Sequence, residues 1–125
     1  MIILGIDPGL ARVGYGVIAV DEPEPWQPGP CDRPGGSGAA TNGSQSLLDC
    51  GILRTEPGCS DGERMVEIAR DLRQLIRIWR PQLAAVEKFF FYRSSTTISV
   101  VQARGVLIMT LARFRVPVVE FPPMQ

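Results

Sequence analysis

The chain has 125 residues, 45% of them hydrophobic and 21% charged, which is typical of one globular domain and excludes a disordered chain. Its zero net charge argues against a strong polyanion binder, and the lack of histidine and of any CxxC spacing among Cys31, Cys50 and Cys59 excludes common zinc sites and histidine triads. The odd cysteine count, the absence of a signal peptide and a longest apolar run of only residues 106–112 predict a cytoplasmic protein without a membrane span.

The first predicted strand covers residues 2–6 and ends on one carboxylate, Asp7, which Pro8 and Gly9 follow at once. A short apolar run bounded by Pro and Gly is typical of a buried strand. Because an unpaired buried carboxylate is costly, Asp7 is expected at the rim of a sheet, beside a cation or hydrogen-bond donors. The alternative is a strand-end aspartate that only accepts hydrogen bonds from the turn after it.

Two further strands are predicted over residues 13–20 and 47–55, and together with the first they form an antiparallel meander. Residues 21–46 lie between them and are rich in Pro, Gly and Ser. This composition predicts a disordered insertion in a loop between strands, not a separate domain.

A helix is predicted from Ser60, which forms a capping box with Glu63, as far as Pro81. Apolar residues recur at spacings of three and four along it, which is the period of one buried helix face. The arginines at other positions are typical of a solvated face: Arg64, Arg70, Arg73, Arg77 and Arg80.

A fourth strand over residues 83–88 completes a βαβ crossover and therefore runs parallel to the first strand. If it lies beside the first strand, Asp7 and Glu87 reach the same edge and the same face of the sheet. The two carboxylates would repel each other, and Mg²⁺ bound to their oxygens resolves that repulsion. Paired Mg²⁺ ions about 4 Å apart activate water and stabilise the leaving oxygen of a phosphodiester. Glu120, a later acid, is interpreted as a supporting or structural residue.

The aromatic cluster at residues 89–92 has basic flanks, and at least two of its rings are expected in the core. A helix over residues 95–114 and a strand over residues 116–121 follow. This helix is unusually apolar and has Gly105 in its middle, so we expect it to bury more than one face, one of them against a second copy of the chain.

The zero net charge conceals an asymmetry along the chain. Residues 1–62 hold three basic and eight acidic residues, and residues 63–125 hold ten basic and five acidic residues. The halves therefore carry −5 and +5, which leaves room for a positive face. Twelve of the 13 basic residues are arginine, which suits phosphate binding, although a GC-rich coding sequence also favours arginine codons.

Four stretches resemble the RuvC-type Holliday junction resolvases: LGIDPGLARVGYGVI, AAVEKFFF, QARG and VPVVEFPPMQ, in this order. The resemblance covers the chain outside residues 21–46. It implies a ribonuclease-H-like α/β fold, with a five-stranded mixed sheet flanked by helices. It further implies a homodimer that cuts four-way DNA junctions with two Mg²⁺ ions, alongside a branch-migration helicase complex.

The same resemblance assigns roles to individual residues. Asp7 and Glu87 match catalytic acids and metal ligands, and Phe90 matches an aromatic placed against bases at the junction. Arg12, Lys88 and Arg93 are the basic residues expected beside the DNA. The helix that holds Gln102, Arg104 and Gly105 resembles the dimer helix of the family.

The sequence departs from the family pattern at its end. Members of the family supply further catalytic acids from a C-terminal helix, whereas this sequence stops at Gln125. Residues 1–125 are therefore expected to form a single, C-terminally incomplete nuclease domain that is inactive alone. Two alternatives stay open, namely the phosphate-binding half of an actin- or sugar-kinase-type ATPase and a non-catalytic DNA-binding or dimeric remnant.

Overall fold

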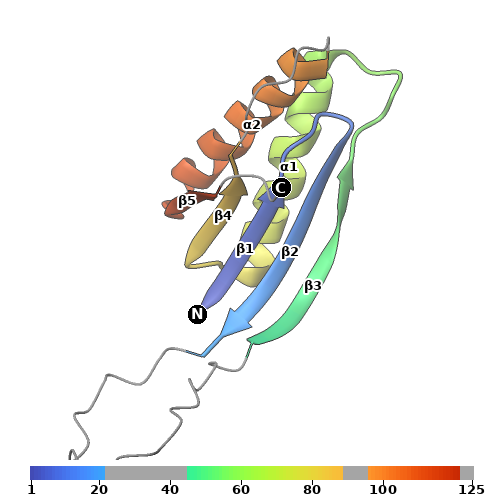
Figure 1. Ribbon diagram of the computed structural model, residues 1–125. Coiled ribbons are helices and arrows are strands. Elements are labelled where there is room, and N and C mark those ends of the chain that lie inside the picture. Colours follow the sequence, from blue (N-terminus) through green and yellow to red (C-terminus); the bar gives the residue numbers. More distant parts are fainter. Residues whose placement is uncertain (22–44, 89–95, 122–125) are drawn as a thin grey trace, which may run out of the picture.

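The computed structural model describes residues 1–21, 45–88 and 96–121. They form a five-stranded sheet with two helices side by side against one of its faces (Figure 1). The predicted type and order of the elements are confirmed. The elements are β1 (Ile2–Asp7), β2 (Arg12–Val20), β3 (Gln45–Arg54), α1 (Asp61–Trp79), β4 (Leu83–Glu87), α2 (Thr96–Arg113) and β5 (Val118–Phe121).

The strands lie in the order β3-β2-β1-β4-β5, with β1 at the centre. β2 is antiparallel to β1 and β3, whereas β4 pairs in parallel with both β1 and β5. The predicted meander and the crossover that places β4 beside β1 are therefore confirmed. Because β1, β4 and β5 run in the same direction, their carboxyl ends meet at one edge of the sheet.

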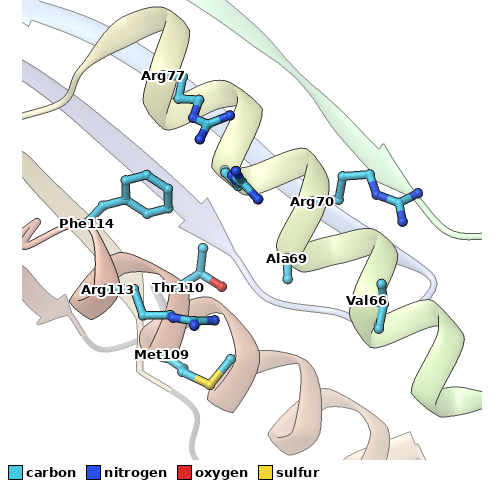
Figure 2. A pocket seen from close by; sticks show the side chains of 9 residues that line it. Val66, Ala69, Arg70, Arg77, Met109, Thr110, Arg113 and Phe114 are labelled. Carbon is cyan, nitrogen blue, oxygen red and sulfur yellow. The ribbon is translucent and has the colours of Figure 1, made fainter.

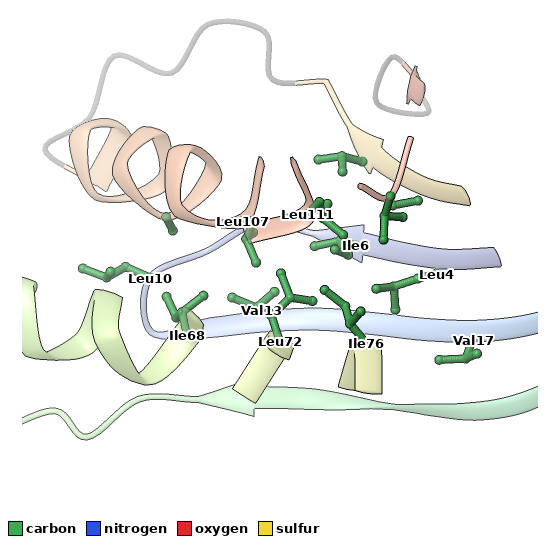
Figure 3. Packing of buried hydrophobic residues seen from close by; sticks show 14 residues of the cluster. Leu4, Ile6, Leu10, Val13, Val17, Ile68, Leu72, Ile76, Leu107 and Leu111 are labelled. Atoms are coloured by element: carbon green, nitrogen blue, oxygen red, sulfur yellow. The ribbon is translucent and has the colours of Figure 1, made fainter. Parts of the chain in front are cut away.

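One cluster of buried apolar side chains joins both helices to the sheet (Figure 3). Leu4 and Ile6 of β1 belong to it, so strand alternation places Gly5 and Asp7 on the face away from the helices. The same alternation on β4 separates buried Val86 from Glu87. The cluster also includes Val13, Val17, Ile68, Leu72, Ile76, Ala84, Ala103, Leu107 and Leu111.

Helix α1 begins as predicted. Ser60 is its N-cap, and the reciprocal hydrogen bonds of the capping box with Glu63 are both present. Arg80, which precedes Pro81, ends the helix in a left-handed conformation with φ of 46°, and its N–H donates to the carbonyl oxygen of Ile76. Arg80 is thus the C-cap of the helix, and it lies one residue before Pro81, on which the predicted helix end was based.

Helix α2 buries one face within the chain, through Ala103, Leu107 and Leu111, whereas the expected burial of another face against a second copy stays a prediction. Some of its other apolar residues are exposed: Ile98 is 68% exposed and Val101 is 53% exposed. The described residues therefore leave part of α2 without an apolar neighbour. Neither α1 nor α2 is long and apolar enough to cross a membrane.

Several element boundaries differ from the prediction by one or two residues. β3 begins at Gln45, inside the predicted insertion, because Gln45 pairs with Val20 across the sheet. β4 ends at Glu87 and β5 begins at Val118. The described residues do not include residues 22–44 of the predicted insertion or the aromatic cluster at residues 89–92.

Candidate metal centre

Asp7 and Glu87 are the last residues of the two neighbouring parallel strands β1 and β4. In the register of this pair, Gly5 lies opposite Ala85 and Ile6 lies opposite Val86. One more residue along each strand brings the two carboxylates side by side, on the face that the helices leave uncovered. The predicted proximity of these two acids is confirmed, and their catalytic role stays a prediction.

The two carboxyl groups interact directly. A hydrogen bond with Asp7 raises the pKa of Glu87 above its ordinary value, and partial desolvation and the negative charge of Asp7 raise it further. Two like charges this close to each other are unfavourable, and a bound cation would offset their repulsion.

The donor set fits a hard divalent cation. Both side chains offer oxygen ligands, and such a cation commonly binds one or two carboxylates and completes its shell with water and phosphate oxygens. Within residues 1–21, 45–88 and 96–121, no third Asp, Glu, His or Cys joins them in a cluster that could hold a metal. The site described here is therefore a two-carboxylate site.

A shallow hollow of about 320 Å³ lies beside Asp7. Gly14 pairs with Asp7 and Gly16 pairs with Gly5, so the surface next to the carboxylate is made largely of backbone. The glycines were not predicted as site residues, although the GYG pattern in the second strand of a hairpin was the available signal. The lining residues are Gly5, Ile6, Asp7, Gly14, Tyr15, Gly16 and Phe121.

The turn that follows Asp7 is tightly packed and anchored. The hydroxyl of buried Thr55 donates to the carbonyl oxygen of Leu10 at 2.8 Å, and the N–H of Thr55 donates to that of Ala11 at 3.2 Å. A Cβ added at Gly9 would lie 2.3 Å from the carbonyl oxygen of Arg12, which is much closer than atoms can approach. The turn therefore requires glycine at this position.

We expect Gly9→Ala to lower the free energy of unfolding by about 1–3 kcal/mol, because the added methyl group must displace the start of β2. Urea denaturation measures the change. Gly62→Ala is the matched control, since a Cβ there meets no heavy atom within 4 Å, and it is expected to change stability by less than about 1 kcal/mol. Equal stability of the two variants would show that the turn tolerates a side chain.

Of the other residues that the sequence predicted to be functional, only some lie near this site. Arg12 is exposed at the start of β2, near the same turn, and the N–H of Lys88 donates to the carbonyl oxygen of Phe121. Gln102 and Gly105 are exposed on α2. Phe90 and Arg93 lie outside the described residues.

Arg104 has a partner within the chain. It forms an ion pair with Glu120, which links α2 to β5. From the sequence, Arg104 was expected only on the helix that packs against a second copy. The ion pair with Glu120 was not predicted. The pair agrees with a structural role for Glu120, whose neighbour Phe121 pairs with Glu87.

Comparison with known proteins supplies the family. The model of crossover junction endodeoxyribonuclease RuvC matches residues 30–125. RuvC of Prochlorococcus marinus (strain MIT 9313) is 70% identical over 125 residues, which are 100% of this chain and 68% of that protein. The chain belongs to the RuvC family. RuvC of Parasynechococcus marenigrum (strain WH8102) is similar to it to the same extent, with 70% identity and 68% of its length covered.

Solved RuvC structures have the same fold. T. thermophilus RuvC in complex with a Holliday junction substrate matches 99% of this chain, which covers 67% of that chain, with a TM-score of 0.77 and 29% identity. The yeast mitochondrial resolvase Ydc2 matches with a TM-score of 0.58 and 13% identity, a likeness of fold alone. The RuvC fold of this chain is ribonuclease-H-like, and the family consists of DNA-hydrolysing endonucleases, which disfavours the ATPase alternative.

Proposed function

We propose that this chain is a nuclease domain of an enzyme that resolves four-way DNA junctions with Mg²⁺, and that Asp7 and Glu87 are two of the catalytic metal ligands of that enzyme. The observation that carries the proposal is the pair of carboxylates side by side at the ends of β1 and β4. The junction as substrate is supported by the Holliday junction DNA bound to T. thermophilus RuvC.

The chain's own residues contribute binding and orientation. Asp7 and Glu87 would hold the metal on the uncovered face, and the backbone surface around Gly14 leaves room for a sugar-phosphate strand beside it. When bound, Mg²⁺ supplies Lewis-acid chemistry and lowers the pKa of water near the phosphodiester. Arg12, Lys88 and Arg93 as phosphate contacts and Phe90 as a stacking residue complete the proposal, on the strength of the family resemblance.

A cleavage assay tests the proposed function. We expect this chain, extended to the full length of its RuvC relatives, to nick a synthetic four-way junction at two symmetric positions with MgCl₂. The 125-residue chain itself is expected to cut far more slowly, because its described site supplies only two acidic ligands. Equal cleavage of a linear duplex of the same sequence, or cleavage in EDTA, would contradict the proposal.

We also propose that α2 packs against α2 of a second copy, through the exposed side chains of Ile98 and Val101. These residues and Gly105 follow one another at spacings of three and four, so they share one side of the helix. A Cβ added at Gly105 meets no heavy atom of the described chain within 4 Å, so the fold of one copy does not require glycine there. A close crossing of two helices would require it. A branch-migration helicase complex stays a proposed partner.

Gly105→Ala is expected to raise the stability of the isolated fold by about 0.5–1 kcal/mol, because alanine loses less backbone entropy in a helix. It should weaken self-association at the same time, and Gly105→Leu should weaken it further. Urea denaturation at low concentration and analytical ultracentrifugation measure the two effects, with Gly62→Ala as the control. Unchanged association of Gly105→Leu would place the dimer contact elsewhere.

A further inference from the structure

A groove of about 580 Å³ runs between α1 and α2, on the outer surface of the two helices. Figure 2 shows Met109, Thr110 and Arg113 on the side of α2 that faces α1. A second hollow, of about 420 Å³, adjoins it on α1 and shares three of its arginines. The groove is lined by Val66, Ala69, Arg70, Arg73, Arg77, Met109, Thr110, Arg113 and Phe114.

The residues that line the groove carry positive charge. Four of the nine lining residues are arginines, and none is acidic. Arg70 is partly compensated by the neighbouring Asp71. In the part of the chain that the structure describes, Arg73, Arg77 and Arg113 form no ion pair. The groove therefore holds guanidinium groups that are available to an anionic partner.

This arrangement is unfavourable for the isolated helix. Residues 70, 73 and 77 are separated by three and four positions, so their like charges lie on one face and repel each other. Their exposure agrees with the sequence-based interpretation of a solvated helix face, and the structure adds that they border a groove. Helix dipoles favour Arg77 and Arg113, which lie in last turns, but not Arg70 and Arg73 in the middle of α1.

Apolar side chains also line the groove. Val66 is 57% exposed, Met109 is 50% exposed and Phe114 is 36% exposed. A phosphate backbone gains little from such contacts, whereas an amphipathic helix that lies in a groove uses them as anchor sites. The combination of an apolar lining with arginines therefore favours a protein segment over nucleic acid.

The groove is distinct from the carboxylate site. The C-terminal ends of α1 and α2 lead into the starts of β4 and β5, and these starts lie at the edge of the sheet opposite Asp7 and Glu87 (Figure 1). Arg77 and Arg113, in the last turns of the two helices, therefore lie toward the far end of the molecule. A partner in the groove would leave the edge that carries Asp7 and Glu87 open.

We propose that the groove between α1 and α2 binds an acidic amphipathic helix of a partner protein. Its apolar residues would contact Val66, Met109 and Phe114, and its carboxylates would pair with the arginines of α1 and with Arg113. The stretch from residue 66 to residue 77 spans about 16 Å at 1.5 Å per residue, so the occupant needs about three helical turns. This proposal does not depend on the proposed nuclease activity.

The probe is a synthetic helical peptide of about 15 residues, with leucine at helical spacing on one face and glutamate beside it. Its binding to the full chain is measured by fluorescence anisotropy without metal, so a failure of the nuclease proposal leaves this result unaffected. A second peptide carries lysine in place of each glutamate. We expect the glutamate peptide to bind and the lysine peptide not to bind.

Charge variants locate the binding site. Arg73→Glu is expected to lower the affinity for the glutamate peptide roughly tenfold. Arg54→Glu, the same change at an exposed residue of β3, should lower that affinity less than about twofold. The double variant Arg73→Glu, Arg77→Glu should acquire binding of the lysine peptide. Equal losses of affinity in Arg73→Glu and Arg54→Glu would show that only the net charge of the protein matters, and this result would overturn the proposal.

A neutral pair of variants tests the apolar contacts. Val66→Ser should lower the affinity for the glutamate peptide severalfold. Ile78→Ser, at a residue of α1 that is 61% exposed and outside the groove, should leave that affinity unchanged. Equal effects of the two variants, or no binding of the glutamate peptide at millimolar concentration, would refute the assignment. Displacement of the peptide by a short DNA duplex, with loss of duplex binding in Arg73→Glu, would identify nucleic acid as the occupant instead.

Discussion

Asp7→Asn is expected to abolish junction cleavage and to leave the protein folded. Asparagine keeps the shape of aspartate but lacks its charge, so one of the two carboxylates that would hold the metal is lost. Removing a residue that only hydrogen-bonds a metal ligand typically lowers metal affinity or activity about 10–100-fold. Loss of a direct metal ligand should have a larger effect. Single-turnover cleavage of a labelled four-way junction, with the chain extended to the length of its relatives, measures the effect.

Stability separates this effect from misfolding. Because Asp7 and Glu87 interact as adjacent carboxyl groups, removing one charge should leave the free energy of unfolding unchanged or raised at neutral pH. Mg²⁺ should stabilise the parent protein against urea and not the variant. Glu87→Gln should behave like Asp7→Asn, whereas Asp61→Asn, at an exposed residue of α1, should cut normally. Cleavage by Asp7→Asn within tenfold of the parent would remove this carboxylate from the chemistry.

Leu72→Ala is expected to destabilise the fold by about 2–5 kcal/mol. Leu72 is 1% exposed on α1 and belongs to the cluster that joins the helices to the sheet (Figure 3), so its truncation leaves a cavity at the centre of the molecule. The loss would be a large part of the 5–15 kcal/mol that is typical of a small domain. The shift of the urea midpoint, combined with the slope of the transition, measures it.

Ile78→Ala is the matched control for this prediction, because Ile78 lies on the same helix and is 61% exposed. It is expected to change the free energy of unfolding by less than about 0.5 kcal/mol. Similar shifts for the two variants would mean that α1 does not pack on the sheet as described.

Much of the carboxylate site could be predicted from sequence because its determinants are local. The strand that ends on Asp7 and the one that ends on Glu87 are each visible as a short apolar run. The handedness and direction of a crossover follow from general rules, and the two-residue period of a strand fixes the face. Together they predicted that the two acids, 80 positions apart in the chain, meet if β4 lies beside β1. That pairing itself is a feature of the tertiary structure.

The features that escaped prediction all depend on how distant segments pair. β3 begins at Gln45 because Val20 lies opposite it in the sheet, and the local Ser-rich composition gave no sign of this pairing. Gly14 faces Asp7 through the register of a hairpin. Arg104 reaches Glu120 only when α2 packs beside β5.

The sequence by itself determined the seven elements, the cap of α1, the family and the two acids, because periodicity, caps and turns depend on neighbouring residues. Only the tertiary structure decided which side of α2 is buried and that the arginines of α1 border a groove with Arg113. The physical reason is that the helical period tells which residues share a face, but not which other helix that face meets. That choice is made when α1 and α2 pack side by side on the sheet.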